Sequence, residues 1–347
     1  MHNNKLVAAG AGIAMLLVAG VAFADTLGPI GFESPTYAVG TINGQDGWSK
    51  TGAYDVAVVA NSYSIPAFGS QVLRISNAVT SGSFGDQTFS KPLVNEAGET
   101  DALNGGMSGG TRQNHFEAQF DLASTMTAVQ PGLMMSVSPD RGAGARMSYL
   151  RFEDQSDGIH VFFDDVQGTS SPANFVETAL PVVSRAPHTV KFVIDFVDGP
   201  SNDVVKIYID SVLVHTGTTW ENYFRFDPES NPSLVSNSRT VDSLLFRTAG
   251  AAAPANAGNG FLVDNVSLVS STPLPPPAVP TDKDQCKKGG WQTLADDQGN
   301  VFKNQGQCVS FVETQKHEDD EDEDEHHENA HHDDDHQDEH GHRGHHD

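Results

Sequence analysis

The residues with the strongest potential for chemistry are the histidines at the C-terminal end of the chain. Ten of the 15 histidines lie in residues 317–347, among 15 acidic residues and one arginine. Neutral imidazoles bind Zn²⁺, Ni²⁺ and Cu²⁺, and neighbouring carboxylates raise the local concentration of cations. The pattern predicts a multi-ion metal site of modest affinity, formed by His317, His326, His327, His331, His332, His336, His340, His342, His345 and His346.

The same segment has a second interpretation, a solvated polyanion that aids solubility. Residues 316–347 contain almost no apolar side chains, so burial cannot offset the entropy lost on ordering. We therefore expect a disordered tail. A defined pair such as His327 and His331 would form only if the segment became helical.

Catalytic chemistry is much less visible in the rest of the chain. A retaining glycosidase needs an acid and a nucleophile about 5–5.5 Å apart, a spacing that alternate residues of a strand can supply. Glu117 and Asp121 share a polar face but are separated by Gln119, an arrangement typical of a solvated face. Hydrolase, metalloprotease and phosphate-loop motifs do not occur either. No catalytic residue is predicted, and an active site without a recognised motif stays open.

Aromatic residues are the main candidates for ligand binding. Sugar rings present apolar faces that stack on aromatic side chains, and Trp48, Trp220 and Tyr223 all occur in polar, turn-like segments. Arg112 and His115 could add hydrogen bonds at the start of a strand. The alternative is that the three aromatic residues cover the core or the edges of sheets.

The elements that must position these residues are strands. Residues 115–122 alternate strictly between polar and apolar, and residues 148–152 and 159–163 flank a turn rich in Asp, Ser and Gly. Val190, Phe192 and Ile194 share one face of a further segment. This period of two predicts antiparallel sheets buried on one face. The fold class is therefore all-β, a two-sheet antiparallel jelly-roll sandwich.

The ends of this body carry a resemblance to a known family. Gly31-Phe32-Glu33, residues 44–48 (GQDGW) and residues 260–266 (GFLVDNV) resemble secreted concanavalin A-like lectin and glucanase jelly rolls, which include the LamG-like domains. The resemblance implies a glycan-binding or surface-binding function. Related modules join their two termini through a structural Ca²⁺, and here Glu33 and Asp264 stand at the matching places. Ordinary edge carboxylates are the alternative, because calcium needs six to eight oxygen ligands.

A small module follows the body. Its two cysteines, Cys286 and Cys308, are the only ones in the chain, and in an exported protein an isolated pair most simply forms one disulfide. The segments around them resemble a short C-terminal cysteine module found on many bacterial exported proteins, for which no activity is established. The expected organisation is a signal peptide (residues 1–24), the jelly roll (25–271), a Pro-rich linker (272–282), the cysteine module (283–315) and the tail (316–347).

The N-terminal segment predicts export from a bacterial cell. A lysine precedes an apolar run that ends in Ala22-Phe23-Ala24, the pattern that signal peptidase cleaves. An uncleaved membrane anchor is the alternative. After cleavage no segment is apolar enough to span a membrane. We expect a secreted, extracellular or cell-surface protein, with the periplasm as the remaining location.

The net charge of the chain limits the classes of partner that it can bind. The net charge is −26, with no basic cluster, which argues against nucleic acid. We expect a glycan or a cell-surface component as partner of the body and divalent metal ions as partners of the tail. The leading hypothesis is a non-catalytic binding protein. The alternatives are a polysaccharide hydrolase or lyase, and a protein that sequesters Zn²⁺, Ni²⁺ or Cu²⁺ outside the cell.

Metal binding by the tail can be tested directly. Several Zn²⁺ ions should bind per chain near pH 8, and the affinity should fall steeply toward pH 5, because protons compete for imidazoles with a pKa of about 6.5 or higher. Truncation after Gln315 should abolish this binding without changing the melting of the body. Calorimetry measures both effects. If the truncated chain binds Zn²⁺ as well as the full chain, or if the full chain binds it equally at pH 5 and pH 8, the metal-site interpretation is wrong and the tail is only a solubilising polyanion.

Overall fold

The structure is a computed structural model that divides the chain into two units, residues 1–273 and 274–347. It describes residues 24–102, 110–227, 239–248, 250–272, 278–298, 300 and 302–324, with the side chains of 316–324 left out. Nearly all of the expected signal peptide and the tail histidines from His326 onward lie outside the described residues. Metal binding by the tail and cleavage of the leader therefore stay predictions.

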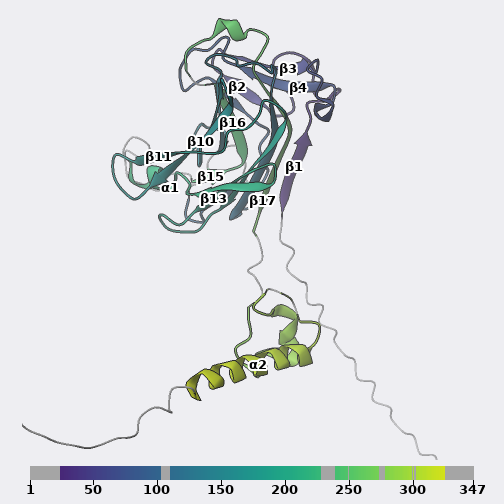
Figure 1. Cartoon of the computed structure of the whole chain (residues 1–347), viewed down its shortest axis with the longest axis vertical. Helices are drawn as coiled ribbons and strands as arrows, with labels where there is room; N and C mark the ends of the chain where they lie inside the picture. The colour runs from purple at the N-terminus through teal and green to yellow at the C-terminus, as the bar shows by residue number, and fades with distance from the viewer. Residues whose placement is uncertain are drawn as a thin grey trace, which may run out of the picture. The chain divides into compact units, whose positions relative to one another are not determined.

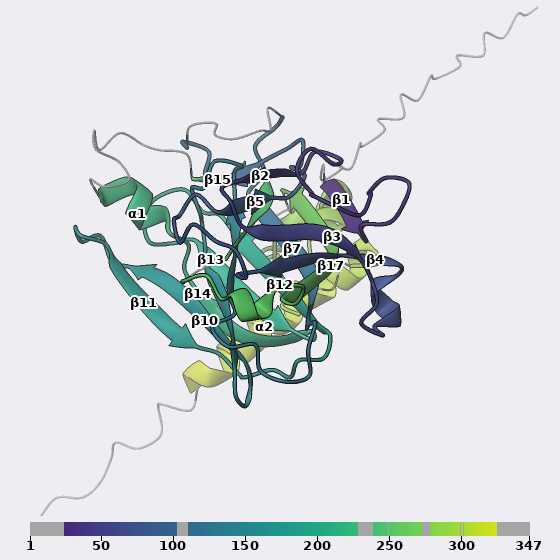
Figure 2. The ribbon, with the colours of Figure 1, turned by 90° about the horizontal axis from the view of Figure 1, so that it is seen from above.

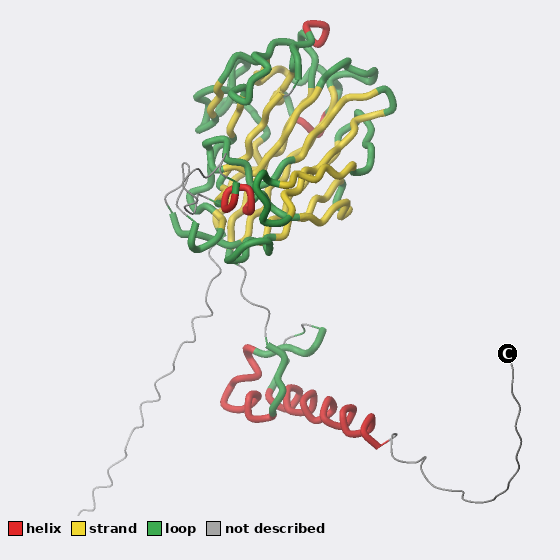
Figure 3. The backbone as a smooth tube through the Cα atoms, turned by 90° about the vertical axis from the view of Figure 1, so that its left-hand side faces the viewer, coloured by secondary structure: helices red, strands yellow, loops and turns green. Residues whose placement is uncertain are grey.

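The first unit is a sandwich of two antiparallel sheets, as the alternating pattern predicts (Figures 1 and 3). One sheet has eight strands in the order β14-β13-β12-β7-β17-β4-β3, with β1 also paired to β17. Its strands are β1 (Asp25–Ile30), β3 (Asp55–Ala60), β4 (Gln71–Ser76), β7 (His115–Ser124), β12 (His188–Asp195), β13 (Val204–Ile209), β14 (Val212–Gly217) and β17 (Phe261–Ser271).

The second sheet has seven strands in the order β11-β10-β9-β8-β16-β5-β2. Its strands are β2 (Ser49–Thr51), β5 (Gln87–Phe89), β8 (Met134–Asp140), β9 (Leu150–Gln155), β10 (Gly158–Gln167), β11 (Asn174–Ala179) and β16 (Ser243–Thr248). A short ladder joins β6 (Ala97–Gly98) to β15 (Thr240–Val241). The helical segments of this unit are η1 (Pro66–Phe68), η2 (Pro254–Asn256) and α1 (Glu221–Phe226).

The core lies between the two sheets and follows the alternation of the strands. Phe116, Ala118, Phe120 and Leu122 of β7 are buried, whereas the residues between them face outward. The inward residues of β12 and β13 behave in the same way, in the hairpin that the sequence predicts. Burial of one such large apolar side chain stabilises the fold by roughly 1.5–3 kcal/mol. The two inner faces together therefore supply the main stabilisation of the sandwich.

Strand β17 connects the ends of the body. It pairs with β7 along one edge, and along the other edge first with β4 and then with β1. A bulge between Asp264 and Ser267 lies where the pairing passes from β4 to β1. Bulges of this kind bend a strand and re-aim its side chains. The two ends of the jelly roll thus meet at the bulge, with Asp264 at its start.

The second unit is stapled by the predicted disulfide. Cys286 and Cys308 are bonded, with their Cα atoms 5.8 Å apart, and both are fully buried. They join η3 (Lys283–Thr293) to α2 (Gln305–Asp324), around a small core completed by Phe302 and Val312. The helix α2 continues to Asp324, so its last residues belong to the segment expected to begin the tail at residue 316. No described helix of either unit is both long enough and apolar enough to cross a membrane.

The disulfide should be needed by the second unit only. Cys308→Ser should unfold residues 283–315, because the bond removes loop-closure entropy worth roughly 3 kcal/mol from the unfolded chain and its sulfurs form the centre of a small core. The body has a separate core and should melt at an unchanged temperature. Limited proteolysis reports on the small unit and calorimetry on the body. Earlier melting of the body in the variant would contradict this independence.

Candidate functional site

A cavity of the body opens at the outer face of the seven-stranded sheet. Its volume is about 720 Å³, within the usual range of about 300–1,000 Å³ for small-molecule sites. The floor comes from outward-facing residues of β5, β10 and β16, and the walls from loops around α1. Its lining residues are Phe84, Gln87, Ala143, Gly144, Ala145, Arg146, Tyr149, Asp164, Phe175, Trp220, Tyr223, Phe224 and Arg247.

Aromatic side chains form one continuous wall of this pocket, which we call the aromatic wall: Tyr149, Phe175, Trp220 and Tyr223. The Trp220 ring stacks on Tyr149 with centroids 5.9 Å apart and meets Phe175 edge-on at 5.0 Å. Tyr223 contacts both Phe175 and Trp220. Phe175 remains 47% exposed. An apolar surface of this kind, open to solvent and rimmed by polar groups, is typical of a binding site.

The aromatic wall comes from segments far apart in the sequence. Tyr149 precedes β9, and Phe175 is in the edge strand β11. Tyr223 belongs to α1, and Trp220 is the residue just before this helix. In both ribbon views α1 lies on the same side of the body as β11 (Figures 1 and 2). The indole N–H of Trp220 donates to the Asp164 carbonyl at 2.8 Å, which ties the wall to β10.

The segment that carries Trp220 is held by buried carboxylates. Asp165 accepts a hydrogen bond from the Thr218 N–H at 2.6 Å. This close approach requires glycine at residue 217, because a Cβ there would lie 2.3 Å from Asp165 Oδ1. Asp203 accepts from the Thr219 hydroxyl, and Glu221 accepts from the Asn202 and Asp203 N–H groups. Loops lack ladder hydrogen bonds, so these side chains supply the partners that the backbone needs.

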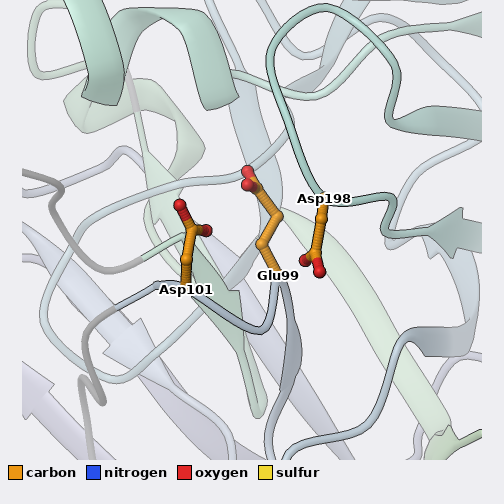
Figure 4. Close-up of side chains that lie close together, drawn as sticks. All are labelled: Glu99, Asp101 and Asp198. Atoms are coloured by element: carbon orange, nitrogen blue, oxygen red, sulfur yellow. The ribbon is translucent and has the colours of Figure 1, made fainter.

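A second buried network supports the far end of α1. Arg239 is fully buried and donates to Glu99 and to Asp101, both at 2.7 Å, while Arg225 of α1 also pairs with Glu99. Glu99 lies between Asp101 and Asp198 in Figure 4, and the three could form a metal site by proximity alone. The guanidinium groups already neutralise Glu99, so this cluster is an ion-pair network and needs no cation.

Two acids in this region titrate abnormally. Burial, together with the negative charge of Glu177, raises the pKa of Asp164, on the pocket wall, to about 6. Burial and the neighbouring Glu221 raise the pKa of Asp203 to about 7. Both carboxyl groups therefore carry less charge near neutral pH than ordinary aspartates.

The structure divides the five residues expected to bind a ligand. Trp220 and Tyr223 both line the pocket. The expectation for Trp48 is wrong: it is 1% exposed and packs against Phe32 and Phe246, so its ring covers the core and cannot meet a sugar. The turn-like sequence around Trp48 is real, but its side chain points inward from that turn.

Arg112 and His115 lie away from this pocket. Arg112 pairs with Glu96 at 2.7 Å. His115 lies on the outer face of the eight-stranded sheet, where its Nδ1 is 2.6 Å from Asp195 Oδ1. The pocket opens on the outer face of the other sheet, so the structure does not bring these two residues together with Trp220.

Several residues of the pocket escaped the sequence analysis. The unpredicted group comprises Phe84, Arg146, Tyr149, Asp164, Phe175 and Arg247. One signal was available: residues 142–145 (GAGA) form a glycine-rich loop between two strands, Arg146 follows at once, and Tyr149 comes three residues later. The other residues look like ordinary outward positions of strands, and only their meeting in space distinguishes them.

The structure does bring Glu33 and Asp264, the residues expected at a calcium site, close together. Gly31 lies between them, and a Cβ at this residue would be 3.6 Å from Asp264 Oδ1 and 4.0 Å from Glu33 Cγ. A third carboxylate, Asp121 of β7, stands directly opposite Asp264 in the ladder. Among the described residues none of the three is paired with a basic side chain. The sequence analysis missed Asp121 as part of this group.

The chemistry of this group fits a hard cation. Asp264 is 1% exposed, and burial together with the charges of Asp121 and Glu33 raises its pKa to about 7. Like charges opposite one another in adjacent strands destabilise a sheet. Glu33 is held in place by the Ser70 and Gln71 N–H groups at 2.6 and 3.1 Å. Carboxylate oxygens are the ligands that Ca²⁺ prefers. In the described residues, the oxygens of these three carboxylates are not all within 4.8 Å of one another.

Comparison with known proteins adds no functional assignment. No family model and no curated protein match the chain. Among solved structures, it is similar to a protein of unknown function from Shewanella oneidensis MR-1, with 14% identity, a TM-score of 0.40 and coverage of 72% of this chain and 87% of that one. A lectin, UEA-II complexed with galactose, gives 11% identity, a TM-score of 0.35 and coverage of 73% and 99%. An alginate lyase from Alteromonas sp. 272 has 9% identity and a TM-score of 0.29, and the match covers 46% of this chain and 73% of the lyase chain. At these scores the fold assignment rests on the strand order itself.

Proposed function

We propose that the body is a carbohydrate-binding domain that binds a sugar ring in the pocket on the seven-stranded sheet. Export by the leader would place this pocket outside a bacterial cell, where polysaccharides occur. The leader, the location and the glycan partner are part of the proposal.

The observation that carries the proposal is the aromatic wall. Four aromatic side chains in mutual contact line an open cavity, and Phe175 keeps almost half of its surface exposed. Trp220 and Tyr223 also pack against the main core, whereas Phe175 does not, so the exposed Phe175 ring is the part of the wall that a ligand explains best. Sugar rings combine an apolar face with a polar rim, and the pocket combines an aromatic wall with polar groups such as Gln87 and Asp164.

Binding is favoured over cleavage for a chemical reason. Hydrolysis of a glycosidic bond uses two carboxyl groups, either about 5–5.5 Å or about 6.5–9.5 Å apart. The described lining of the pocket contains one carboxyl group, Asp164. We therefore assign no acid and nucleophile pair, and the alternative of a polysaccharide hydrolase or lyase is tested beside binding.

Loss of the aromatic wall should abolish glycan binding. Phe175→Ala and Trp220→Ala should each weaken the affinity of the full chain for its best glycan at least about tenfold, because large aromatic side chains dominate such interfaces. Phe162→Ala is the matched control: Phe162 faces outward from β10 two residues before Asp164 but does not line the pocket. A glycan array first selects the best ligand, and calorimetry then measures the affinity of each variant for it.

The same samples test catalysis. New reducing ends, or unsaturated products that absorb in the ultraviolet, would favour the enzymatic alternative. Equal loss of affinity in Phe162→Ala would contradict the location of the site. Phe175 is the more informative position, because half of its side chain is exposed and the variant should fold normally.

We also propose that Glu33, Asp121 and Asp264 hold a structural Ca²⁺. A bound calcium would offset most of the negative charge of the three carboxylates and join the segment after β1, β7 and the bulge of β17. This proposal concerns stability and is independent of the sugar pocket. The tail as a store of Zn²⁺, Ni²⁺ or Cu²⁺ remains a third proposal, supported by its histidines alone.

Calcium should stabilise the body through these carboxylates. After treatment with chelator, Ca²⁺ at about 100 times its Kd should raise the Tm of the body by about 5–10 °C, the shift expected for about 2.7 kcal/mol in a domain of this size. Asp264→Asn and Asp121→Asn should remove the shift. Glu117→Gln, on the same outer face of β7 as Asp121, should keep it. A calcium response of normal size in Asp264→Asn would disprove the site.

A further inference from the structure

The sugar pocket contains two arginines that the proposed function has not yet used. Arg247 faces outward from β16, and Arg146 comes from the glycine-rich loop between β8 and β9. Both guanidinium groups lie over the ring of Phe84, with Cζ 4.4 Å from the centroid for Arg247 and 5.7 Å for Arg146. Two positive charges from different elements therefore converge on the Phe84 ring in the cavity.

Both guanidinium groups have buried donors without a partner. Nε of Arg247 and both Nε and Nη2 of Arg146 have no described hydrogen-bond acceptor, and neither have the Nε atoms of Arg74, Arg141 and Arg225. Arg247 is only 7% exposed, and its one described hydrogen bond is a long contact of 3.4 Å to the Ser83 carbonyl. Within the described residues, neither arginine is within salt-bridge distance of a carboxylate. The arginines that do have such a partner are Arg74, Arg112, Arg151, Arg185, Arg225 and Arg239.

The local charge balance is positive. The nearest acid to Arg146 in electrostatic terms is Asp140, whose Oδ1 accepts from the Ala143 and Gly144 N–H groups. Burial raises the pKa of Asp140, and even when ionised this one acid cannot balance two arginines. Burial and the neighbouring Arg247 both lower the pKa of Arg146. Buried like charges with free donors are costly unless an anion binds between them.

The acid on the pocket wall belongs to a different charge environment. The charges that act most strongly on Asp164 are those of Glu177, Arg151 and Asp165. Those that act on Arg146 are Asp140, Arg247 and the Tyr149 and Tyr223 side chains of the aromatic wall. The basic groups at Phe84 and the acid beside Trp220 thus have different charged neighbours, and the aromatic wall lies near Arg146.

Resting on the carbohydrate-binding function proposed above, we infer that the pocket binds an acidic polysaccharide, with the carboxylate of a uronic acid between Arg146 and Arg247 and its ring against the aromatic wall. A guanidinium group presents two parallel N–H donors in a plane, which match the two oxygens of a carboxylate. The unpaired N–H groups of the two arginines are the reason to expect an anionic ligand. The aromatic wall is the reason to expect that this anion is the carboxylate of a sugar ring. The glycine-rich loop lets Arg146 approach without a bulky neighbour.

The test compares a charged glycan with its neutral counterpart. The probes are oligogalacturonate and a galacto-oligosaccharide of the same length, with oligogalacturonate fully methyl-esterified as a second neutral probe. Calorimetry on the full chain at pH 7.5 should give at least tenfold tighter binding of the acidic oligomer, and the preference should shrink as salt is raised. Arg146→Gln and Arg247→Gln should each bring the ratio of the two affinities close to one.

Matched controls separate this claim from a structural effect. Arg151→Gln removes an arginine from the same sheet face that pairs with Glu153 and Glu177 and does not line the pocket, so it should retain the preference. Arg247→Lys keeps the positive charge but loses the planar pair of guanidinium N–H donors, so it should lose part of the preference for the acidic oligomer. Because Arg247 is buried, each variant is first checked for an unchanged Tm, and Arg146→Gln carries the conclusion if Arg247→Gln does not fold.

The outcomes are distinct. Equal affinity for acidic and neutral oligomers would overturn this inference and leave the sugar pocket intact. A full preference in Arg146→Gln would overturn the role of the arginines. Stronger binding of a sulfated oligomer than of oligogalacturonate would overturn the choice of a carboxylate. Absence of binding to every glycan in an array of acidic and neutral sugars would refute the proposed function and this inference together.

Discussion

Burial of one face of each strand between the two sheets is the constraint on which the rest of this structure depends. Successive side chains of a strand point to opposite faces. Once Phe120, Phe152 and Phe246 pack against one another in the core, the side chains of their neighbours must point to the outer faces of the sheets. Phe246 is followed by Arg247, and Phe163 by Asp164. Arg247 and Asp164 are therefore placed in the pocket by the same packing that holds the sheets together.

The aromatic wall depends on a second kind of interaction. Trp220 and Tyr223 belong to an irregular segment in which backbone groups have no sheet partner. Buried acids replace that partner: Asp165 holds Thr218, and Glu221 holds the neighbouring loop. Ionised side chains make strong acceptors when they are fully hydrogen-bonded. The raised pKa values of Asp203 and Glu221 reflect the cost of keeping these two acids out of water. The loops of the pocket are thus rigid enough to align rings from three separate elements.

Two places in the body concentrate charge of one sign. Asp264, Asp121 and Glu33 meet at the bulge of β17, and Arg146 and Arg247 meet over Phe84. Other buried charges have partners of opposite sign, as Glu99 does in Arg225 and Arg239. This contrast is the reason for proposing that the two places bind an external ion. An ion-pair network needs nothing further, whereas converging like charges gain stability from a ligand of opposite charge.

The sequence alone determined the fold class, because the period of two in segments such as residues 115–122 leaves only a sheet with one buried face. It also determined the disulfide, because only two cysteines exist, and it identified Trp220, Tyr223, Glu33 and Asp264 as candidates. What it could not decide is which way a turn residue points. Trp48 and Trp220 have similar local sequences, but Trp48 turns into the core and Trp220 toward the pocket. The meeting of Arg146 with Arg247, and of Asp121 with Asp264, was decided only by the tertiary structure, because both pairings depend on strands that are adjacent in space and distant along the chain.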